Sequence, residues 1–406
     1  MNEHLLVGID VGCHSHQVAI AKSNGTYLKE FGISHNASGF NSLFSEITYY
    51  ESTLKCPVVI GMEGFNGYAR PLDQLIQQKG YTLYNINNLK LARFKELFSG
   101  PAKTDAIDAR KIVEFMRIAP SFQEQRRAIT EIKPGNGVNQ TLKRLTRRRR
   151  QLVNEKDLYP ESDARLSFQS VAPGLVDLVK NVDSRWYLHF LTCRPSLRQL
   201  ATMRKESLLK IKGVGKKYAA VITSWQKEAH FSTDVDLVSS MIIEDAKRIL
   251  ELMEAIATIE QELEPLGEQS DLAVTIGSIP GFGLISSAEL AGEIDNLSRF
   301  PSEKSLALYL GMAPLDNSSG KKEGCKIAKS VNTRAKAAMM VAVAHHSWQV
   351  EESKRYYEKK RAEGKKHNQA IRSLGRHLVR VIWSLIKENR SYEIREENER
   401  NILKMA

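Results

Sequence analysis

The chain has 406 residues, of which 42% are hydrophobic and 26% are charged, which is ordinary for a globular protein and long enough for two or three domains. Lysine and arginine outnumber aspartate and glutamate by 59 to 47. The resulting net charge of +12 favours a polyanionic partner, nucleic acid before membrane.

Membrane and disulfide-rich classes are excluded by the same inspection. No apolar run approaches the roughly 20 residues needed to span a bilayer, and the N-terminus has no apolar signal segment. The four cysteines are scattered without Cys-x-x-Cys spacing, which fits neither a zinc site nor a disulfide framework. We therefore expect a cytoplasmic protein with no membrane partner.

The first region, 1–125, alternates between strand and helix patterns. Strands are predicted at 5–10, 17–21, 27–31, 57–63 and 81–86, and helices at 36–50 and 67–79. A polar loop carrying Lys90, Arg93 and Lys95 follows, and the next helix starts at Asp105. This order predicts an α/β domain in which helices flank a mixed sheet.

Two aspartates open that last helix of the first region. Asp105 and Asp108 share one helix face, at the end where the helix dipole favours negative charge. Taken alone, the pair is explained by a helix N-cap and a solvated acid, without any functional role. The flanking Lys103 and Arg110 are candidate neighbours of a nucleic-acid phosphate, or they balance the acids.

The second region, 126–270, is predicted to form basic coiled-coil arms. A helix over 138–159 has a narrow apolar stripe, and a second helix around 241–259 is expected to end before Pro265 and to pair with it antiparallel. The first helix carries six cations, which either contact a nucleic-acid phosphate backbone or form a solvated helix face. They are Lys143, Arg144, Arg147, Arg148, Arg149 and Arg150.

An insertion at about 160–238 interrupts these arms and carries a helix-hairpin-helix pattern. The pattern is an apolar residue, then Gly-x-Gly, then an alanine-rich helix start. It occurs at Gly213-Val214-Gly215 and again, farther along the chain, at Gly281-Phe282-Gly283. Such glycines let backbone N–H groups approach a phosphate. For the first copy, flanked by Lys212, Lys216 and Lys217, we expect phosphate binding. For the second, a tight turn without ligand stays an alternative.

The third region, 271–392, is predicted to be mostly helical, and a charged tail follows at 393–406. A polar, glycine-rich loop at 314–324 contains Ser318 and Ser319, followed by Lys321 and Lys322. A basic stretch that includes Arg334 and a basic helix from Lys365 to about Asn389 come next. Lys321, Lys322 and Arg334 are candidate nucleic-acid contacts.

Four acids from separate segments suggest a metal site. Asp10 and Glu63 each end a predicted buried strand, where sites form in α/β sheets. If they converge with Asp105 and Asp108, the carboxylates repel one another unless a cation lies among them. Hard oxygen ligands suit Mg²⁺ or Mn²⁺, which can clamp a phosphodiester. Asp10 alone could equally be a strand-end acid satisfied by backbone groups.

Several ordered motifs resemble one known family. Gly8-Ile9-Asp10, Met62-Glu63-Gly64 and the run 103–110 are similar to the D-E-D-D domain, a RuvC-like domain with the RNase H fold, of bridge-RNA-guided transposases of the insertion-sequence-110 type, relatives of the Piv and MooV invertases. Residues 279–283, Arg299-Phe300, 310–314 and 318–320 resemble the second domain of that family. The resemblance covers residues 1–120 and about 270–390.

The resemblance implies a DNA recombinase in a bacterial or archaeal cytoplasm. Asp10, Glu63, Asp105 and Asp108 would bind Mg²⁺, and Ser319 would attack a DNA phosphate to form a phosphoserine intermediate. Ser318 stays an alternative nucleophile, and an arginine role in the family falls to Arg334 or Lys336. The implied partners are double-stranded donor and target DNA, a guide RNA and further copies of the chain in a dimer or tetramer.

Three other functions compete with this interpretation. A RuvC-like nuclease or Holliday-junction resolvase would use metal-activated water and leave Ser319 structural. A sugar-kinase or actin-like ATPase would use Gly8 to Gly12 as a phosphate loop, but no second glycine-rich phosphate loop follows. A non-catalytic nucleic-acid-binding protein would not need the four acids.

Overall fold

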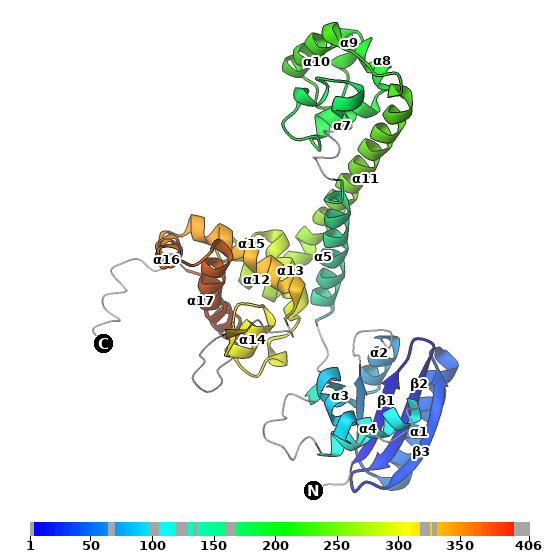
Figure 1. Ribbon diagram of the computed structural model, residues 1–406. Helices are drawn as coiled ribbons and strands as arrows, with labels where there is room; N and C mark the ends of the chain where they lie inside the picture. Colours follow the sequence, from blue (N-terminus) through cyan, green and yellow to red (C-terminus); the bar gives the residue numbers. More distant parts are fainter. Residues whose placement is uncertain are drawn as a thin grey trace, which may run out of the picture. The chain divides into compact units, whose positions relative to one another are not determined.

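A computed structural model describes residues 4–63, 70–97, 105–118, 129–132, 136–159, 168–316, 325–326 and 331–393. The chain divides into two compact units, Met1–Gly135 and Asn136–Ala406. The first is built on a β-sheet and the second is mostly helical (Figure 1). We call them the sheet unit and the helical unit.

The sheet unit contains a six-stranded mixed sheet in the order β3-β2-β1-β4-β5-β6. Strand β1 runs antiparallel to β2 and parallel to β4, and β4 runs parallel to β5. The mixed α/β prediction is therefore confirmed, and the architecture is consistent with a RuvC-like domain. Strand β6, which was not predicted, adds an antiparallel edge. The strands are β1 (Leu5–Val11), β2 (Ser15–Lys22), β3 (Tyr27–Ser34), β4 (Val58–Glu63), β5 (Thr82–Ile86) and β6 (Ile129–Glu131).

The helices of the sheet unit are α1 (Ala37–Leu54), α2 (Arg70–Gln78), α3 (Asn88–Leu97) and α4 (Asp105–Ile118). Helix α3 replaces the polar loop that the sequence predicted, so that prediction is wrong. Asn87 caps the helix by accepting a hydrogen bond from the Lys90 N–H at 3.1 Å. Leu91 is buried, and the ring of Phe94 lies 5.0 Å from that of Phe115 in α4. Two apolar contacts are enough to hold a short polar helix.

Two glycines allow α4 to lie directly on the sheet. Gly8 of β1 and Gly61 of β4 are paired in register. A Cβ on Gly8 would lie 2.7 Å from the carbonyl oxygen of Ala109, and one on Gly61 would collide with the Met116 sulfur. Alternate residues of a strand face the same side. Asp10 and Glu63, each two residues after its glycine, therefore face the side that α4 covers.

The helical unit begins with α5 (Gly137–Lys156), which packs on α11 (Val235–Glu268). Arg149 pairs with Glu260, whereas Glu155, later in α5, pairs with the earlier Arg248. The predicted antiparallel pairing is confirmed. Helix α11 continues past Pro265, so the predicted end before this proline is wrong.

Packing on both sides of Pro265 explains the continuation of α11. Leu263 and Gly267 are buried, and a Cβ on Gly267 would lie 3.2 Å from Leu284. Burial against the following helices therefore offsets the backbone hydrogen bond that the proline removes.

A small helical lobe lies between α5 and α11 in the sequence and packs on the first half of α11. Its own core contains Tyr187, Phe190, Leu197 and Trp225, which join Val235 at the start of α11. The lobe corresponds to the predicted insertion. Its elements are η3 (Val176–Leu178), α7 (Arg185–Thr192), α8 (Leu197–Ala201), α9 (Lys205–Leu208) and α10 (Lys216–Glu228).

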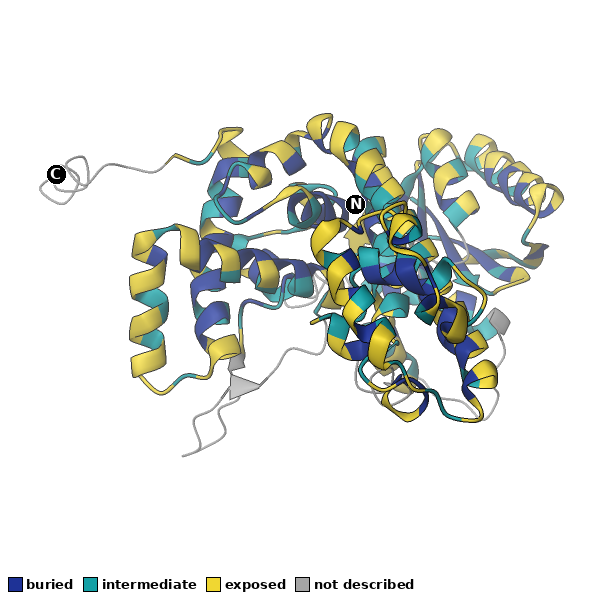
Figure 2. Cartoon of the chain, turned by 90° about the horizontal axis from the view of Figure 1, so that it is seen from above, coloured by how far each residue is buried: buried dark blue, intermediate teal, exposed yellow. Residues whose placement is uncertain are grey.

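The rest of the helical unit packs around α13, α15 and α17, whose buried residues share one core. Figure 2 shows the general pattern of buried and exposed residues on opposite sides of the helices. The short strands β7 and β8 pair antiparallel on either side of 317–324, which lies outside the described residues. No helix in the described part of the chain is both long and apolar enough to cross a membrane. The elements are α12 (Asp271–Gly277), α13 (Leu284–Ile294), η4 (Leu297–Arg299), α14 (Glu303–Tyr309), β7 (Leu315–Asp316), β8 (Cys325–Lys326), α15 (Thr333–Gln349), α16 (Glu351–Ala362) and α17 (His367–Glu388).

Candidate active site

The sheet unit brings together acids that are distant in the sequence. Strands β1 and β4 are parallel neighbours, and their register pairs Ile9 with Met62. Asp10 and Glu63 are therefore the next positions along the two strands, at the same edge of the sheet. Both residues are partly exposed. This edge, at the carboxyl ends of parallel strands, is where α/β sheets form ligand sites.

Lys95 of α3 joins two of these acids. Its Nζ lies 3.4 Å from Glu63 Oε2 and 3.3 Å from Asp108 Oδ2. All three side chains are largely buried, with exposed fractions of 21%, 24% and 13%. Acids from β4 and α4 thus share one ammonium group. Sequence reasoning missed this role because it placed Lys95 in a loop, although the helical spacing of Leu91 and Phe94 was a usable signal.

The remaining residues around the D-x-x-D motif have different positions. Asp105 is the first residue of α4, and its side chain is outside what the structure describes, as is all of Lys103. Arg110 forms an ion pair with Glu30 and lies over the ring of Tyr27. That hydrogen-bonded carboxylate raises the pKa of Arg110. The partner of Arg110 is thus Glu30 of β3, which is not one of the four acids that it was expected to balance, and its contact with a phosphate stays a prediction.

The donor set suits a hard divalent cation. Carboxylate oxygens are the ligands that Mg²⁺ and Mn²⁺ prefer, and the Lys95 ammonium already occupies a position between two of them as a stand-in cation. Among the described residues, no three His, Cys, Asp or Glu side chains are close enough to form a preassembled cluster. Glu63 and Asp108, the described acids beside Lys95, offer oxygen donors of the type that such a cation prefers.

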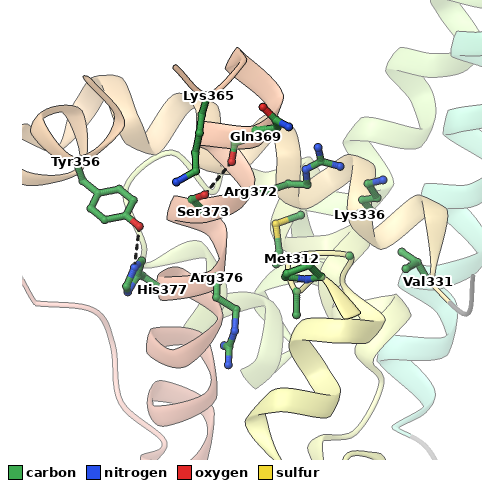
Figure 3. A pocket seen from close by; sticks show the side chains of 13 residues that line it. Met312, Val331, Lys336, Tyr356, Lys365, Gln369, Arg372, Ser373, Arg376 and His377 are labelled. Carbon is green, nitrogen blue, oxygen red and sulfur yellow. Dashed lines mark hydrogen bonds between the residues drawn. The ribbon is translucent and has the colours of Figure 1, made fainter. Parts of the chain in front are cut away.

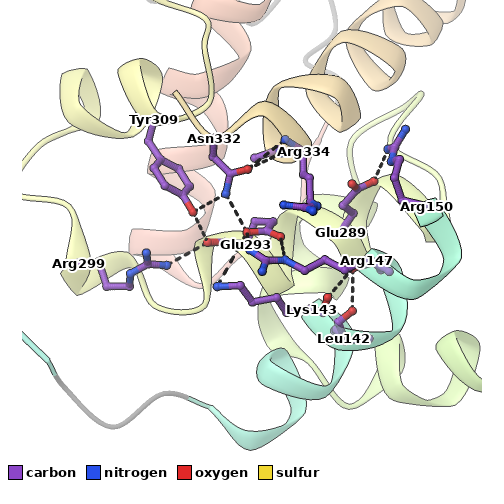
Figure 4. Close-up of polar contacts among 12 residues, drawn as sticks. Leu142, Lys143, Arg147, Arg150, Glu289, Glu293, Arg299, Tyr309, Asn332 and Arg334 are labelled. Atoms are coloured by element: carbon purple, nitrogen blue, oxygen red, sulfur yellow. Dashed lines mark hydrogen bonds and ion pairs between the residues drawn. The ribbon is translucent and has the colours of Figure 1, made fainter. Parts of the chain in front are cut away.

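Most cations of α5 are engaged within the helical unit (Figure 4). Arg147 donates to both oxygens of Glu293, at 2.7 and 3.0 Å. Arg150 donates to Glu289 at 2.6 Å, and Arg149 pairs with Glu260. The six predicted nucleic-acid contacts thus divide into two groups. Lys143, Arg147, Arg149 and Arg150 lie near acids of α13 and α11, whereas Arg144 and Arg148 are exposed and have no ion pair in the described part of the chain.

Glu293 is the centre of a buried polar network that sequence reasoning missed. Asn332 donates to its carboxylate at 2.7 Å, and Tyr309 and Arg299 donate to its backbone carbonyl, each at 2.9 Å. Burial alone would raise the pKa of Glu293, but the hydrogen bonds from Arg147 and Asn332 hold it below its usual value. The usable signal was a pair of acids in the otherwise apolar run 288–294.

This network fixes the start of α15, directly after the serine-containing segment. Asn332 also caps α15 by accepting hydrogen bonds from the backbone N–H groups of Arg334 and Ala335, each at 3.1 Å. The Arg334 side chain is exposed. Ser318, Ser319, Lys321 and Lys322 lie outside the described residues, so their predicted roles stay predictions.

The two glycine motifs differ in their surroundings. Gly213 has a φ of +84°, a Cβ on Gly215 would meet nothing, and Lys212, Lys216 and Lys217 are exposed. In the second copy, Gly281 has a φ of +87°, and a Cβ there would collide with the backbone N of His346. A Cβ on Gly213 would also lie 3.0 Å from Trp186 Cβ, and one on Gly283 would meet nothing, so each motif has one closely packed glycine and one open glycine. The exposed lysines distinguish the first motif from the second.

Comparison with known proteins identifies the family. Residues 7–157 match a family model of DEDD-type transposases related to IS110, and residues 273–358 match the transposase family IS116/IS110/IS902. The chain belongs to this transposase family. The transposase is 24% identical to the 42 kDa protein of insertion element IS900 from Mycobacterium paratuberculosis, over 97% of its own length and 98% of the relative's.

Two further relatives extend over almost the whole transposase. It is 24% identical to the 44.8 kDa protein of insertion element IS116 from Streptomyces clavuligerus and 23% identical to the 43.6 kDa protein of IS110 from Streptomyces coelicolor. Each comparison covers 96% of both chains. The transposase is therefore an enzyme that acts on DNA, and the predicted family resemblance is confirmed.

Proposed function

We propose that the transposase cuts and rejoins DNA through a Mg²⁺- or Mn²⁺-dependent centre and a serine nucleophile. Asp10, Glu63, Asp105 and Asp108 would hold the cation, and Ser319 would attack the DNA. The observation that supports the metal centre most directly is the Lys95 ammonium between Glu63 and Asp108. A position where partly buried acids already hold one cation suits another, more highly charged one.

The serine step conserves the energy of the phosphodiester. The Ser319 oxygen bonds to the DNA phosphorus as the bond from phosphorus to one DNA oxygen breaks, and the proton that the serine hydroxyl loses is balanced by one taken up by that oxygen, which leaves as a free DNA hydroxyl. A hydroxyl of another DNA end then attacks the same phosphorus and releases the serine, which rejoins the strands without another energy source. A bound divalent cation would stabilise charge on the phosphate during both steps.

Replacing the acids tests the metal centre. Glu63→Gln and Asp108→Asn should lower cleavage of an element-end DNA by at least about 100-fold. They should also weaken Mn²⁺ binding measured by electron paramagnetic resonance without DNA. Glu46→Gln is the matched control, because Glu46 lies in the same unit and its ion pair, in the part of the chain that the structure describes, is with Lys29. Unchanged Mn²⁺ binding in both acid variants would refute the metal centre.

The serine is tested separately from the acids. Ser319→Ala should abolish a covalent protein–DNA adduct on a denaturing gel and should also abolish strand transfer, whereas Ser318→Ala should retain both. If Ser319→Ala still cuts DNA at the wild-type rate without an adduct, a metal-activated water mechanism of the resolvase type is correct instead. The reverse result for the two serines would assign the nucleophile to Ser318.

We also propose that a structured guide RNA directs the choice of DNA. This proposal rests on the family resemblance and on exposed lysines around Gly213 and Gly215 of the lobe. Sequencing the RNA that copurifies with the transposase should recover one discrete species encoded beside the gene. Recovery of only bulk cellular RNA would contradict it.

A further inference from the structure

A basic pocket opens between the end of α14, the start of α15, and helices α16 and α17 (Figure 3). Its volume of about 600 Å³ lies within the range of small-ligand sites. None of the described residues that line it is acidic. The polar and aromatic lining residues are Lys336, Tyr356, Lys365, Gln369, Arg372, Ser373, Arg376 and His377.

The four strong cations of this pocket are not equally neutralised. Arg376 pairs with Glu303, and Lys365 pairs with Glu363 at 3.1 Å. Lys336 and Arg372, in contrast, have no acidic partner among the described residues, and Arg372 donates only to the backbone carbonyl of Asn368. Both are partly buried. Holding such charges partly out of water is costly unless an anion joins them.

Burial and the positive charge around the pocket lower the pKa of a neighbouring histidine, His377. Burial has the largest effect on this pKa, and the positive charge is that of Arg380, Arg376 and Lys360. His377 Nε2 lies 3.0 Å from the Tyr356 hydroxyl, and their rings meet edge to face. One wall of the pocket therefore presents an aromatic pair beside cations, a combination that suits a nucleotide.

Packing holds Lys336 in place before any ligand arrives. Gly311 has a φ of +69°, and a Cβ there would lie 2.7 Å from Lys336 Cδ and 2.9 Å from Val331 Cγ1. The aliphatic part of Lys336 thus lies against bare backbone, which reduces the entropy lost on binding. In the sequence, the lining residues Pro314 and Val331 stand on either side of the segment that contains Ser319.

We propose that this pocket binds a backbone phosphate of the DNA strand through Lys336 and Arg372, with Tyr356 and His377 contacting the adjoining sugar or base. DNA is favoured over other phosphate carriers because the enzyme acts on DNA and because the pocket accommodates more than a free ion. The pocket is formed by residues other than the four acids. The proposal rests on DNA as the substrate of the proposed function, and it does not depend on the metal centre or on Ser319.

The test measures DNA binding rather than strand transfer. A Lys336→Gln, Arg372→Gln double variant is titrated against a labelled duplex from the element end, with fluorescence anisotropy read at several salt concentrations. We expect binding to weaken about tenfold and the salt slope to fall by about 1, for one lost phosphate contact. Lys387→Gln, an exposed lysine of the same α17, should change neither quantity.

Other results would overturn the proposal. These are wild-type DNA affinity in the double variant, an equal loss in Lys387→Gln, and a loss confined to an RNA duplex of the same sequence. Lys336→Arg with Arg372→Lys keeps the charges and should retain most of the binding, which separates charge loss from misfolding. Ser319→Ala should bind DNA normally, so failure of the serine mechanism would leave this result unaffected.

Discussion

At the scale of single residues, Lys95 resolves a charge problem that the acids create. Glu63 and Asp108 come from different elements and would repel each other in a site that is mostly closed to water. One ammonium within 3.4 Å of both offsets that repulsion. The position of the acids at strand ends was visible in the sequence. The lysine was not, because its role depends on α3 folding back over the same edge.

His16 makes the sheet unit sensitive to acid. It is fully buried in β2, opposite Val11 of β1, and its Nε2 lies 2.8 Å from His35 Nδ1. Burial, and then the charge of His35, lower the pKa of His16 to about 4. The folded state therefore disfavours the protonated ring, whereas the unfolded chain binds the proton at about pH 6.5.

The stability that depends on a neutral His16 should thus be lost as the pH falls from about 6.5 to about 4, and this contribution should not change further below that range. We expect His16 to contribute about 2 kcal/mol of it, less than the full shift allows because protein relaxation admits water. Urea unfolding followed by circular dichroism at pH 7 and pH 4 measures this loss. It should be smaller in His16→Gln than in the wild type, and equal losses in the two proteins would contradict the assignment.

At the scale of elements, strands β1 to β5 were predictable because their apolar runs are bounded by turns, whereas the two- and three-residue strands β6, β7 and β8 were too short to give a pattern. The main errors concerned helices whose sequence is locally unfavourable. Helix α3 is polar, and α11 contains Pro265, yet burial of Leu91 and of Leu263 stabilises them. Such tertiary contacts override local preference and cannot be read from one segment.

Contact between α4 and the sheet should depend on the absence of a side chain at Gly8. Gly8→Ala places a Cβ against the Ala109 carbonyl, which can move only if α4 moves. We expect a destabilisation of about 2 kcal/mol, measured by urea unfolding, and slower DNA cleavage because Asp108 moves with the helix. In Gly32→Ala the Cβ meets only the Gln17 side-chain amide, which can shift. Similar stability in both variants would contradict this contact.

The cations of α5 should separate into structural and DNA-binding groups. Arg147→Ala removes the side chain that donates two hydrogen bonds to the fully buried Glu293. We expect the free energy of unfolding to fall by about 3 kcal/mol, although Lys143 and Asn332 remain beside the carboxylate. The salt dependence of DNA binding by the Arg147→Ala variant should not change. Arg144→Ala with Arg148→Ala should leave stability within about 0.5 kcal/mol and reduce the salt slope by up to about 2. The opposite pattern would show that Arg147 follows the phosphates.

At the scale of the whole molecule, the candidate catalytic groups are divided between two units. The acids belong to the sheet unit and Ser319 belongs to the helical unit. Sequence reasoning proposed both sets because each has a motif, but motifs do not give the position of one set relative to the other. Motifs report local chemistry, whereas the pairing of a sheet edge with a distant serine depends on how units and copies assemble. The basic pocket escaped it because Lys336 of α15 is distant in the sequence from Lys365 and from the two arginines of α17.

The resemblance to recombinases predicts an oligomer, and mixing two inactive variants tests whether its sites are shared. In a mixed dimer of Asp108→Asn and Ser319→Ala chains, a site made within one chain always contains one defect. A site made between chains is different, because one of the two combines intact acids from the Ser319→Ala chain with the intact serine of its partner. We therefore expect covalent DNA adduct to reappear on mixing, up to about half of the mixed dimers' sites, and only on the Asp108→Asn chain. A mixture that stays inactive, although light scattering and subunit exchange show mixed oligomers, would mean that each chain completes its own site.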